Sequence, residues 1–330
     1  MTIHAQTHRL ISIQSTGGTE VLSIHEEELP TIAPTEVLVK TLATGVNFIE
    51  TYQRAGIYTM PLPFTPGSEA CGEVIAKGSQ IQEFKIGDRI TTASAQGTYA
   101  EHFVVDQAQA VLVPEGISDD VAAAIPLQGM TAHYLVNSTF PVQPEHTVLF
   151  HAGAGGVGGI AIQLLKAIGA TVITTVSTDE KERIAKAHGA DYVLRYDNFA
   201  QQTLELTDGK GVDVVYDSVG KDTFDDSLTT LKKRGMAVLF GGASGQVPPF
   251  DLQRLNALGG LFVTRPSLAH YLLTREEMQW RMKELFDRVL AKELTITVDQ
   301  IFSLDDAAAA HAYLEARKTR GKVLLKPSLS

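Results

Sequence analysis

A glycine cluster between a strand pattern and a helix pattern most constrains how this chain can fold. Gly153, Gly155 and Gly158 fit the pattern G-x-G-x-x-G within HAGAGGVGGIAIQ (151–163). The apolar run 147–150 before the cluster is typical of a buried strand, and the apolar residues after it recur at helical spacing. A strand, a glycine turn and a helix predict a βα unit whose helix N-terminus binds a pyrophosphate. The alternative is a turn that only packs a helix closely against a strand.

The second strand of this unit, predicted over 171–177, ends without an acidic residue. A site for NADH usually carries an Asp or Glu about 20 residues after the glycines, where it binds the ribose 2′-hydroxyl. Here the strand ends in Val176-Ser177-Thr178, and Lys181 follows. A missing carboxylate and a nearby cation favour a 2′-phosphate, and therefore NADPH. Asp179 and Glu180 bring negative charge close by, so NADH remains the alternative.

Length and charge narrow the class of protein. A chain of 330 residues suggests two domains. The net charge of −10 disfavours nucleic acid or an anionic membrane as the main partner, although it does not exclude a local basic groove. No apolar run is long enough for a transmembrane helix, and the first residues lack the pattern of a signal peptide. The single cysteine, Cys71, permits no internal disulfide, and a cytoplasmic location is expected.

The residues before about 125 and those at the C-terminus predict one domain. Short strand patterns with glycine turns indicate a partly closed β-barrel. Near the C-terminus, Thr274 and Glu277 predict a capping box before a long helix. A second helix is expected over about 304–318, and the strand pattern GKVLLKP (321–327) is expected to return to the first domain.

From about Pro126 onward, strand and helix patterns alternate, which predicts a doubly wound parallel sheet. A nucleotide is expected across the carboxyl ends of its strands. The strands are expected at 147–150, 171–177, 192–194, 212–220, 235–242 and 260–266, and the helices at 131–139, 158–168, 180–188, 199–206 and 223–231.

Several stretches together resemble a known family. They are GVNFIETYQRAGIY (45–58), PFTPGSEACGEV (63–74), HAGAGGVGGIAIQ (151–163), VVYDSVG (214–220), FGGASG (240–245) and VTRPSL (263–268). With the order of the two domains, they are similar to the NADPH:quinone oxidoreductase (zeta-crystallin-like) family of the zinc-independent medium-chain dehydrogenase/reductase superfamily. The resemblance implies an α/β protein with a GroES-like β-barrel catalytic domain (1–125 and 266–330). It also implies an NADP-binding Rossmann domain with a doubly wound parallel sheet (126–265).

Whether this chain has zinc ligands must be judged from its own residues, because the superfamily also contains zinc alcohol dehydrogenases. In the region where those enzymes carry a cysteine, this chain reads Asn47-Phe48-Ile49-Glu50-Thr51, and where they carry Gly-His-Glu it has Gly67-Ser68-Glu69. A catalytic zinc needs about three ligands from Cys, His, Asp or Glu, so no metal is expected. Without a Lewis acid, the reaction favours acceptors that take hydride readily, namely quinones and activated enones.

The resemblance also implies site residues. Asn47 and Tyr52 are the candidate catalytic residues, with Tyr58 as a second tyrosine; the alternatives are a loop Asn that caps its own backbone and a core tyrosine. Cys71 and His151 are interpreted as packing residues. The expected cofactor-binding residues are Asn47, Gln128, Thr131, Gly155, Gly156, Val157, Ser177, Lys181, Tyr196, Ser218, Phe240, Gly241, Ser244, Val263, Thr264, Arg265 and Arg317.

The function expected from these features is NADPH-dependent quinone reduction without zinc. The alternatives are an NADPH-dependent alkenal or enoyl reductase and a nucleotide-binding protein with a structural or RNA-associated role. The apolar strand pattern at 260–266 is expected at the edge of the Rossmann sheet, where an open edge invites pairing. A homodimer through about 261–265 is therefore expected, as the resemblance also implies.

Overall fold

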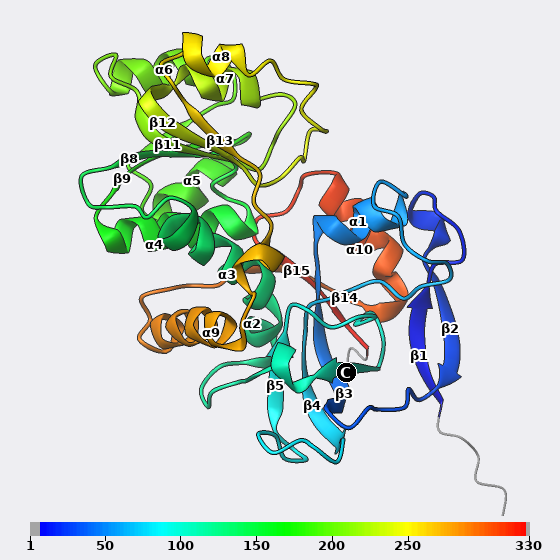
Figure 1. Ribbon diagram of the computed structural model, residues 1–330. Helices are drawn as coiled ribbons and strands as arrows, with labels where there is room; N and C mark the ends of the chain where they lie inside the picture. The colour runs from blue at the N-terminus through cyan, green and yellow to red at the C-terminus, as the bar shows by residue number, and fades with distance from the viewer. Residues whose placement is uncertain (1–6, 328–330) are drawn as a thin grey trace, which may run out of the picture. The chain divides into compact units, whose positions relative to one another are not determined.

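The computed structural model describes residues 7–327 and divides the chain into two compact units (Figure 1). Unit 1 contains the residues up to Leu127 together with 278–292 and those from Ile296 onward. Unit 2 contains 128–277 and 293–295. The functional roles that the sequence assigns to two domains stay predictions. Among the described residues, the helices are all too short or too polar to span a bilayer.

Unit 1 is built on a seven-stranded sheet of the order β14-β15-β3-β4-β5-β7, in which β6 also pairs with β3. A separate antiparallel pair is formed by β1 and β2. The strands are β1 (Thr7–Ser12), β2 (Ser23–Glu28), β3 (Glu36–Val46), β4 (Ala70–Lys77), β5 (Arg89–Thr92), β6 (His102–Asp106), β7 (Val111–Leu112), β14 (Val298–Ser303) and β15 (Lys322–Lys326). The helices are α1 (Phe48–Arg54), α2 (Asp119–Ala124), α9 (Arg275–Leu290) and α10 (Ala307–Glu315).

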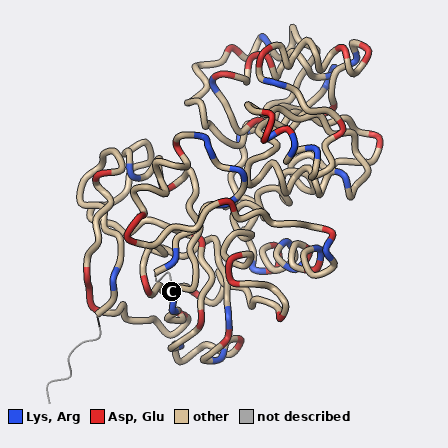
Figure 2. The backbone as a smooth tube through the Cα atoms, turned by 180° about the vertical axis from the view of Figure 1, so that it is seen from behind, with Lys and Arg blue, Asp and Glu red and all other residues tan. Residues whose placement is uncertain are grey.

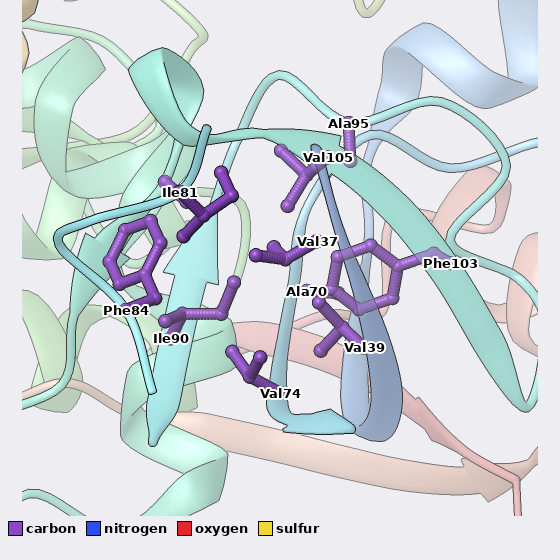
Figure 3. Packing of buried hydrophobic residues seen from close by; sticks show 11 residues of the cluster. Val37, Val39, Ala70, Val74, Ile81, Phe84, Ile90, Ala95, Phe103 and Val105 are labelled. Carbon is purple, nitrogen blue, oxygen red and sulfur yellow. The ribbon is translucent and has the colours of Figure 1, made fainter. Parts of the chain in front are cut away.

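Alternation along β3 builds the core of this sheet. Val37 and Val39 are fully buried, whereas Lys40 is exposed, because successive side chains of a strand point to opposite faces. Figure 3 shows the two valines with Phe103 of β6 and Ile90 of β5 in one apolar cluster.

The C-terminal strand returns to the first sheet, as the sequence predicts. β15 lies between β14 and β3 and is antiparallel to β3. The helix expected over 304–318 is shorter, because a 3-10 turn occupies Leu304–Asp306 and Arg317 has the left-handed φ of 56° that ends a helix. Arg317 therefore lies after α10 and not on it.

Unit 2 contains the predicted parallel sheet, in the order β10-β9-β8-β11-β12-β13. Every pairing in it is parallel. The strands are β8 (Thr147–Phe150), β9 (Thr171–Thr175), β10 (Tyr192–Leu194), β11 (Val212–Asp217), β12 (Leu231–Leu239) and β13 (Phe262–Thr264). The helices are α3 (Pro126–Tyr134), α4 (Gly156–Ile168), α5 (Asp179–Ala187), α6 (Phe199–Leu206), α7 (Phe224–Thr229) and α8 (Gln253–Ala257). In chain order this is the 3-2-1-4-5-6 arrangement of a Rossmann sheet, whose direction of winding reverses between β8 and β11.

One difference from the sequence prediction lies before β12. The strand begins at Leu231 and not at Gly235, and the preceding helix is shorter than predicted. Leu231 already pairs with Val212, and the register resumes at Met236 after Arg234, whose φ is 63°. The first residues of β12 were not predicted, because the charged residues of this irregular stretch do not follow a strand pattern.

Charged residues are mixed along both units. In Figure 2, segments with Lys or Arg are interspersed with segments that carry Asp or Glu.

Candidate functional site

The glycine turn of unit 2 packs closely against the neighbouring strand and against its own helix. A Cβ on Gly153 would lie 2.1 Å from Thr174 Oγ1, and a Cβ on Gly158 would lie 2.3 Å from the Ala152 carbonyl oxygen. These two glycines therefore allow β9 and α4 to approach the turn. At the tip, Gly155 and Gly156 are half-buried, and the first turn of α4 has no acidic residue. The first N–H groups of an α-helix have no partner within the helix, so this end of α4 can bind an anion.

Gln128 of α3 lies against this helix end. A Cβ on Gly156 would be 2.0 Å from Gln128 Oε1. The structure thus brings together Gln128 and Gly156, two of the residues expected from the sequence. Thr131, one turn further along α3, is largely buried.

The end of β9 carries the residues expected to select the cofactor. Thr178 caps α5, where its hydroxyl accepts the backbone N–H of Lys181 at 3.2 Å. Arg195, which the sequence analysis did not single out, pairs through Nη2 with Asp179 at 2.5 Å and with Glu182 at 2.8 Å. It therefore offsets the acidic charge beside Lys181. Its position directly before Tyr196 is the only sequence signal that could have identified it.

His151 begins the glycine turn and is fully buried. Its Nδ1 lies 2.8 Å from Thr175 Oγ1 and its Nε2 lies 2.9 Å from Ser227 Oγ. Burial lowers its pKa, so the ring is neutral at pH 7. The ring also stacks at 6.2 Å on Tyr196. These contacts agree with the packing role inferred from the sequence.

Asp217 organises the loop after β11. Its buried carboxylate accepts the backbone N–H groups of Val219 and Gly220, at 2.8 and 2.9 Å, and the hydroxyl of Thr223. Ser218 and Gly220 are held by this loop, which follows the strand beside β8. The glycine turn and the Asp217 loop thus lie at the carboxyl ends of adjacent strands, where a Rossmann sheet binds nucleotides.

The residues after β12 contact the Asp217 loop. The backbone N–H of Phe240 donates to the Asp217 carbonyl at 2.8 Å, and a Cβ on Gly241 would lie 2.6 Å from the Ser218 carbonyl oxygen. Ser244 Oγ donates to the Val219 carbonyl at 2.8 Å and accepts the Asp222 N–H at 3.0 Å. The Ser244 hydroxyl therefore joins two loops.

The expected residues at the edge of the sheet lie on and after β13. Val263 and Thr264 belong to this strand, which pairs on one side with β12, and Arg265 follows it. Phe262 is 57% exposed and Val263 is 39% exposed.

Unit 1 contains a buried polar cluster formed by Asn47, Glu50, Glu69 and Lys322. Asn47 Nδ2 donates to Glu69 Oε2 at 3.0 Å, and Lys322 Nζ donates to Asn47 Oδ1 at 2.5 Å and to Glu69 Oε2. Glu69 Oε1 accepts the Leu127 N–H at 2.7 Å. From the sequence, Glu69 is a candidate only for a metal ligand, and nothing signals Lys322, which is 275 residues from Asn47.

Glu50 completes this cluster. Its Oε2 accepts the backbone N–H of Asn47 at 2.7 Å, and burial raises the pKa of Glu50 to about 8. The neighbouring ammonium of Lys322 opposes this rise in pKa without cancelling it. Glu50 is therefore largely protonated at pH 7.

The other candidates of unit 1 differ in their surroundings. Tyr52 of α1 contacts the rings of Phe48 and Tyr58, at 6.2 and 5.8 Å between ring centroids. Arg317 is exposed after α10. Cys71 is buried, and burial raises the pKa of its thiol to about 12, which disfavours a nucleophilic thiolate.

Comparison with known proteins extends this description over the whole chain. Residues 33–115 match the alcohol dehydrogenase GroES-like domain, and residues 156–288 match the zinc-binding dehydrogenase family. A quinone oxidoreductase of Pseudomonas aeruginosa is 44% identical over 96% of this chain and 99% of its own. The chain belongs to the quinone oxidoreductase family. The resemblance drawn from the sequence is therefore confirmed, as are the α/β fold and the GroES-like and Rossmann domains.

Two solved structures of the family illustrate the similarity. The quinone oxidoreductase of Escherichia coli complexed with NADPH is 42% identical, with a TM-score of 0.95, and the match covers 97% of this chain and all of that one. A mycobacterial protein complexed with NADPH is 47% identical, with a TM-score of 0.94 and the same coverage. A 2-haloacrylate reductase of a Burkholderia species is 40% identical over 96% of this chain and 98% of its own.

The family model for zinc-binding dehydrogenases raises the question of a metal. Within residues 7–327, no group of three or more His, Cys, Asp or Glu residues could hold a metal ion. Lys322 instead brings an ammonium to Asn47 and Glu69, which belong to the two stretches that correspond to zinc-binding regions in the zinc enzymes.

Proposed function

We propose that this protein is an NADPH-dependent reductase that transfers hydride to a quinone without zinc. The observation that carries the proposal is the glycine turn and the Asp217 loop at the reversal point of a Rossmann sheet. Similarity along the full chain to quinone oxidoreductases, including relatives complexed with NADPH, supports it.

The residues of unit 2 fit this cofactor. Gly155, Gly156 and Val157 leave the start of α4 accessible without a carboxylate to repel phosphate. Lys181 and Tyr196 supply a cation and a hydroxyl for the adenosine 2′-phosphate, and Arg195 offsets the acidic residues beside them. When bound, NADPH supplies a hydride from its nicotinamide.

The remaining assignments belong to the same proposal. Ser177 and Arg317 assist at the 2′-phosphate, and Ser218 contacts the adenosine part. Gln128, Thr131, Phe240, Gly241, Ser244, Val263, Thr264 and Arg265 surround the nicotinamide part. Since the Ser244 hydroxyl already has two loop partners, its contribution is to the shape of the loop.

Asn47 and Tyr52 are proposed as the catalytic residues. An amide N–H or a phenol O–H can donate to the acceptor oxygen, where negative charge develops as hydride arrives. Reduction of a quinone to a hydroquinone needs one hydride and one further proton for each two electrons, and Tyr52 carries an exchangeable proton. An ammonium beside Glu69 repels a metal cation, which supports the zinc-independent reaction.

The purified chain is assayed separately with a quinone and with activated alkenes as acceptors. Oxidation of NADPH is followed by its absorbance with 1,4-benzoquinone, trans-2-hexenal and 2-chloroacrylate. The alkene acceptors are included because a 2-haloacrylate reductase is 40% identical. Faster turnover with quinone supports the proposal, whereas faster turnover with either alkene supports the second candidate. Elemental analysis should give far less than one zinc per chain, and a chelator should leave the rate unchanged.

A homodimer and a cytoplasmic location complete the proposal. β13 ends the parallel sheet and exposes Phe262 and Val263. Two identical edges that pair about a two-fold axis would cover these side chains. The single, buried Cys71 suits a reducing compartment.

A further inference from the structure

The ammonium of Lys322 has an unusual environment for a lysine. It is fully buried at the start of β15, between Asn47 before α1 and Glu69 before β4. Gly45 makes room for it, since a Cβ there would lie 2.8 Å from Lys322 Cε and 2.1 Å from Glu69 Oε2. A buried charge is costly unless it is paired and hydrogen-bonded, so this position must satisfy the ammonium closely.

The contacts determine how the Asn47 amide is turned. An ammonium can only donate, so it must face the amide oxygen, at 2.5 Å. The Glu69 carboxylate can only accept in its ionised form, so it must face the amide nitrogen, at 3.0 Å. A flipped amide would turn NH₂ toward the ammonium and oxygen toward the carboxylate. The orientation therefore follows from the chemistry of the two neighbours.

This orientation decides what Asn47 offers to a ligand. Its oxygen is bound by an ammonium, and one of its two amide N–H groups is bound by Glu69. Among residues 7–327, the other amide N–H is the donor that remains. A ligand oxygen, either a hydroxyl or a carbonyl, matches that donor.

We propose that Lys322 and Glu69 are positioning residues that hold Asn47 as an N–H donor toward an oxygen of the bound cofactor or acceptor. The inference rests on the proposed role of Asn47 in the reaction. A pair that only stabilised the fold would have the same effect whether or not residue 47 carried an amide.

A double-mutant cycle separates the two roles. The pair Glu69→Gln/Lys322→Met removes both charges at once, so no unpaired charge is left behind. It is made in the full chain with Asn47 present and with Asn47→Ala. The Kd for NADPH and the kcat and KM for 1,4-benzoquinone are measured in each. With Asn47 present, we expect the Kd to rise or the kcat to fall about tenfold. With Asn47→Ala, the charge-removing pair should change either quantity by less than about twofold.

The control is a second lysine pair of the same strand. Lys326 pairs with Asp120 at 2.6 Å and is partly exposed. Asp120→Asn/Lys326→Met should change Kd and kcat by less than about twofold in either background. If the buried double variant does not fold, the exchange rate of the Asn47 side-chain amide in the wild-type protein still tests the inference.

Hydrogen exchange of the Asn47 side-chain amide, read by nuclear magnetic resonance, needs no turnover. It should be slow in the wild-type protein and faster in Glu69→Gln/Lys322→Met, with the exposed Asn256 as internal reference. Equal losses with and without the Asn47 side chain would overturn the inference, as would an Asn47 amide that exchanges as fast as that of Asn256. An Asn47→Ala protein with unchanged Kd and kcat would also overturn it. A wild-type protein that binds NADPH but reduces no quinone would contradict the proposed function alone, because the Kd cycle and the exchange rates would still test the inference.

Discussion

The backbone N–H of Asn47 donates to Glu50 Oε2 at 2.7 Å, while the other oxygen of this buried carboxyl has no partner among residues 7–327. A carboxylate with one unpaired oxygen in the interior is costly, and burial raises the pKa of Glu50 from 4.5 to about 8. The neutral form is therefore preferred in the folded protein.

This carboxyl should make the protein less stable as the pH rises. Its folded pKa lies above its unfolded pKa, so its stabilising contribution is complete below pH 4.5 and is lost as the pH rises to about 8. The contribution is on the order of 4 kcal/mol. Urea unfolding at pH 5, 6.5 and 8 measures this loss in the free energy of unfolding.

Glu50→Gln should remove that part of the pH dependence, because Gln keeps the shape and does not ionise. The exposed Glu73→Gln is the control and should retain the wild-type pH dependence. Identical pH profiles for wild type and Glu50→Gln would show that Glu50 is not protonated in the folded protein.

Asp217→Asn should destabilise unit 2. Each partner of the Asp217 carboxylate in the loop is a donor, and an amide would turn its own N–H groups toward some of them. We expect a loss of about 2–4 kcal/mol in the free energy of unfolding, with weaker NADPH binding because the loop carries Ser218. Asp208→Asn, at an exposed left-handed position that Asn tolerates, should change stability little. A smaller loss at Asp217 than at Asp208 would contradict the role of this carboxylate.

Cofactor preference should depend on Lys181 and Arg195. Lys181→Ala removes a phosphate contact and should raise the Kd for NADPH about tenfold or more, with little effect on NADH. Arg195→Ala removes the ion pairs with Asp179 and Glu182, of which Glu182 still pairs with Lys186, and should act in the same direction. Arg183→Ala is the control, because Arg183 is an exposed cation of α5, the helix that carries Lys181. A wild-type protein that prefers NADH would show the assignment to be wrong.

Association should depend on the edge of the parallel sheet. Phe262→Lys puts an ammonium on β13 and should give a monomer by light scattering at micromolar concentration. Leu252→Lys changes a residue that is 71% exposed outside the strands and should leave the dimer intact. A wild-type monomer, or a dimer unaffected by Phe262→Lys, would refute association through β13.

The sequence determined the architecture because that information is local. Periodicity and the glycine cluster predicted the βα units, and the apolar strand pattern at 260–266 predicted the edge of the sheet. Those signals depend on residues within one or two turns of each other. They failed before β12, where Arg234 interrupts the strand pattern with a left-handed conformation.

Only the tertiary structure decided which charged groups meet. Lys322 and Asn47 are 275 residues apart, and neither position signals a partner in the sequence. Pairing of β15 with β3 brings them together in an interior where an ammonium must find a carboxylate and an amide oxygen. Arg195 likewise reaches Asp179 and Glu182 only because β10 pairs with β9, next to α5. Propensity and pattern predict the secondary structure of a segment. The charge and protonation state of a side chain depend instead on the neighbours that folding brings to it.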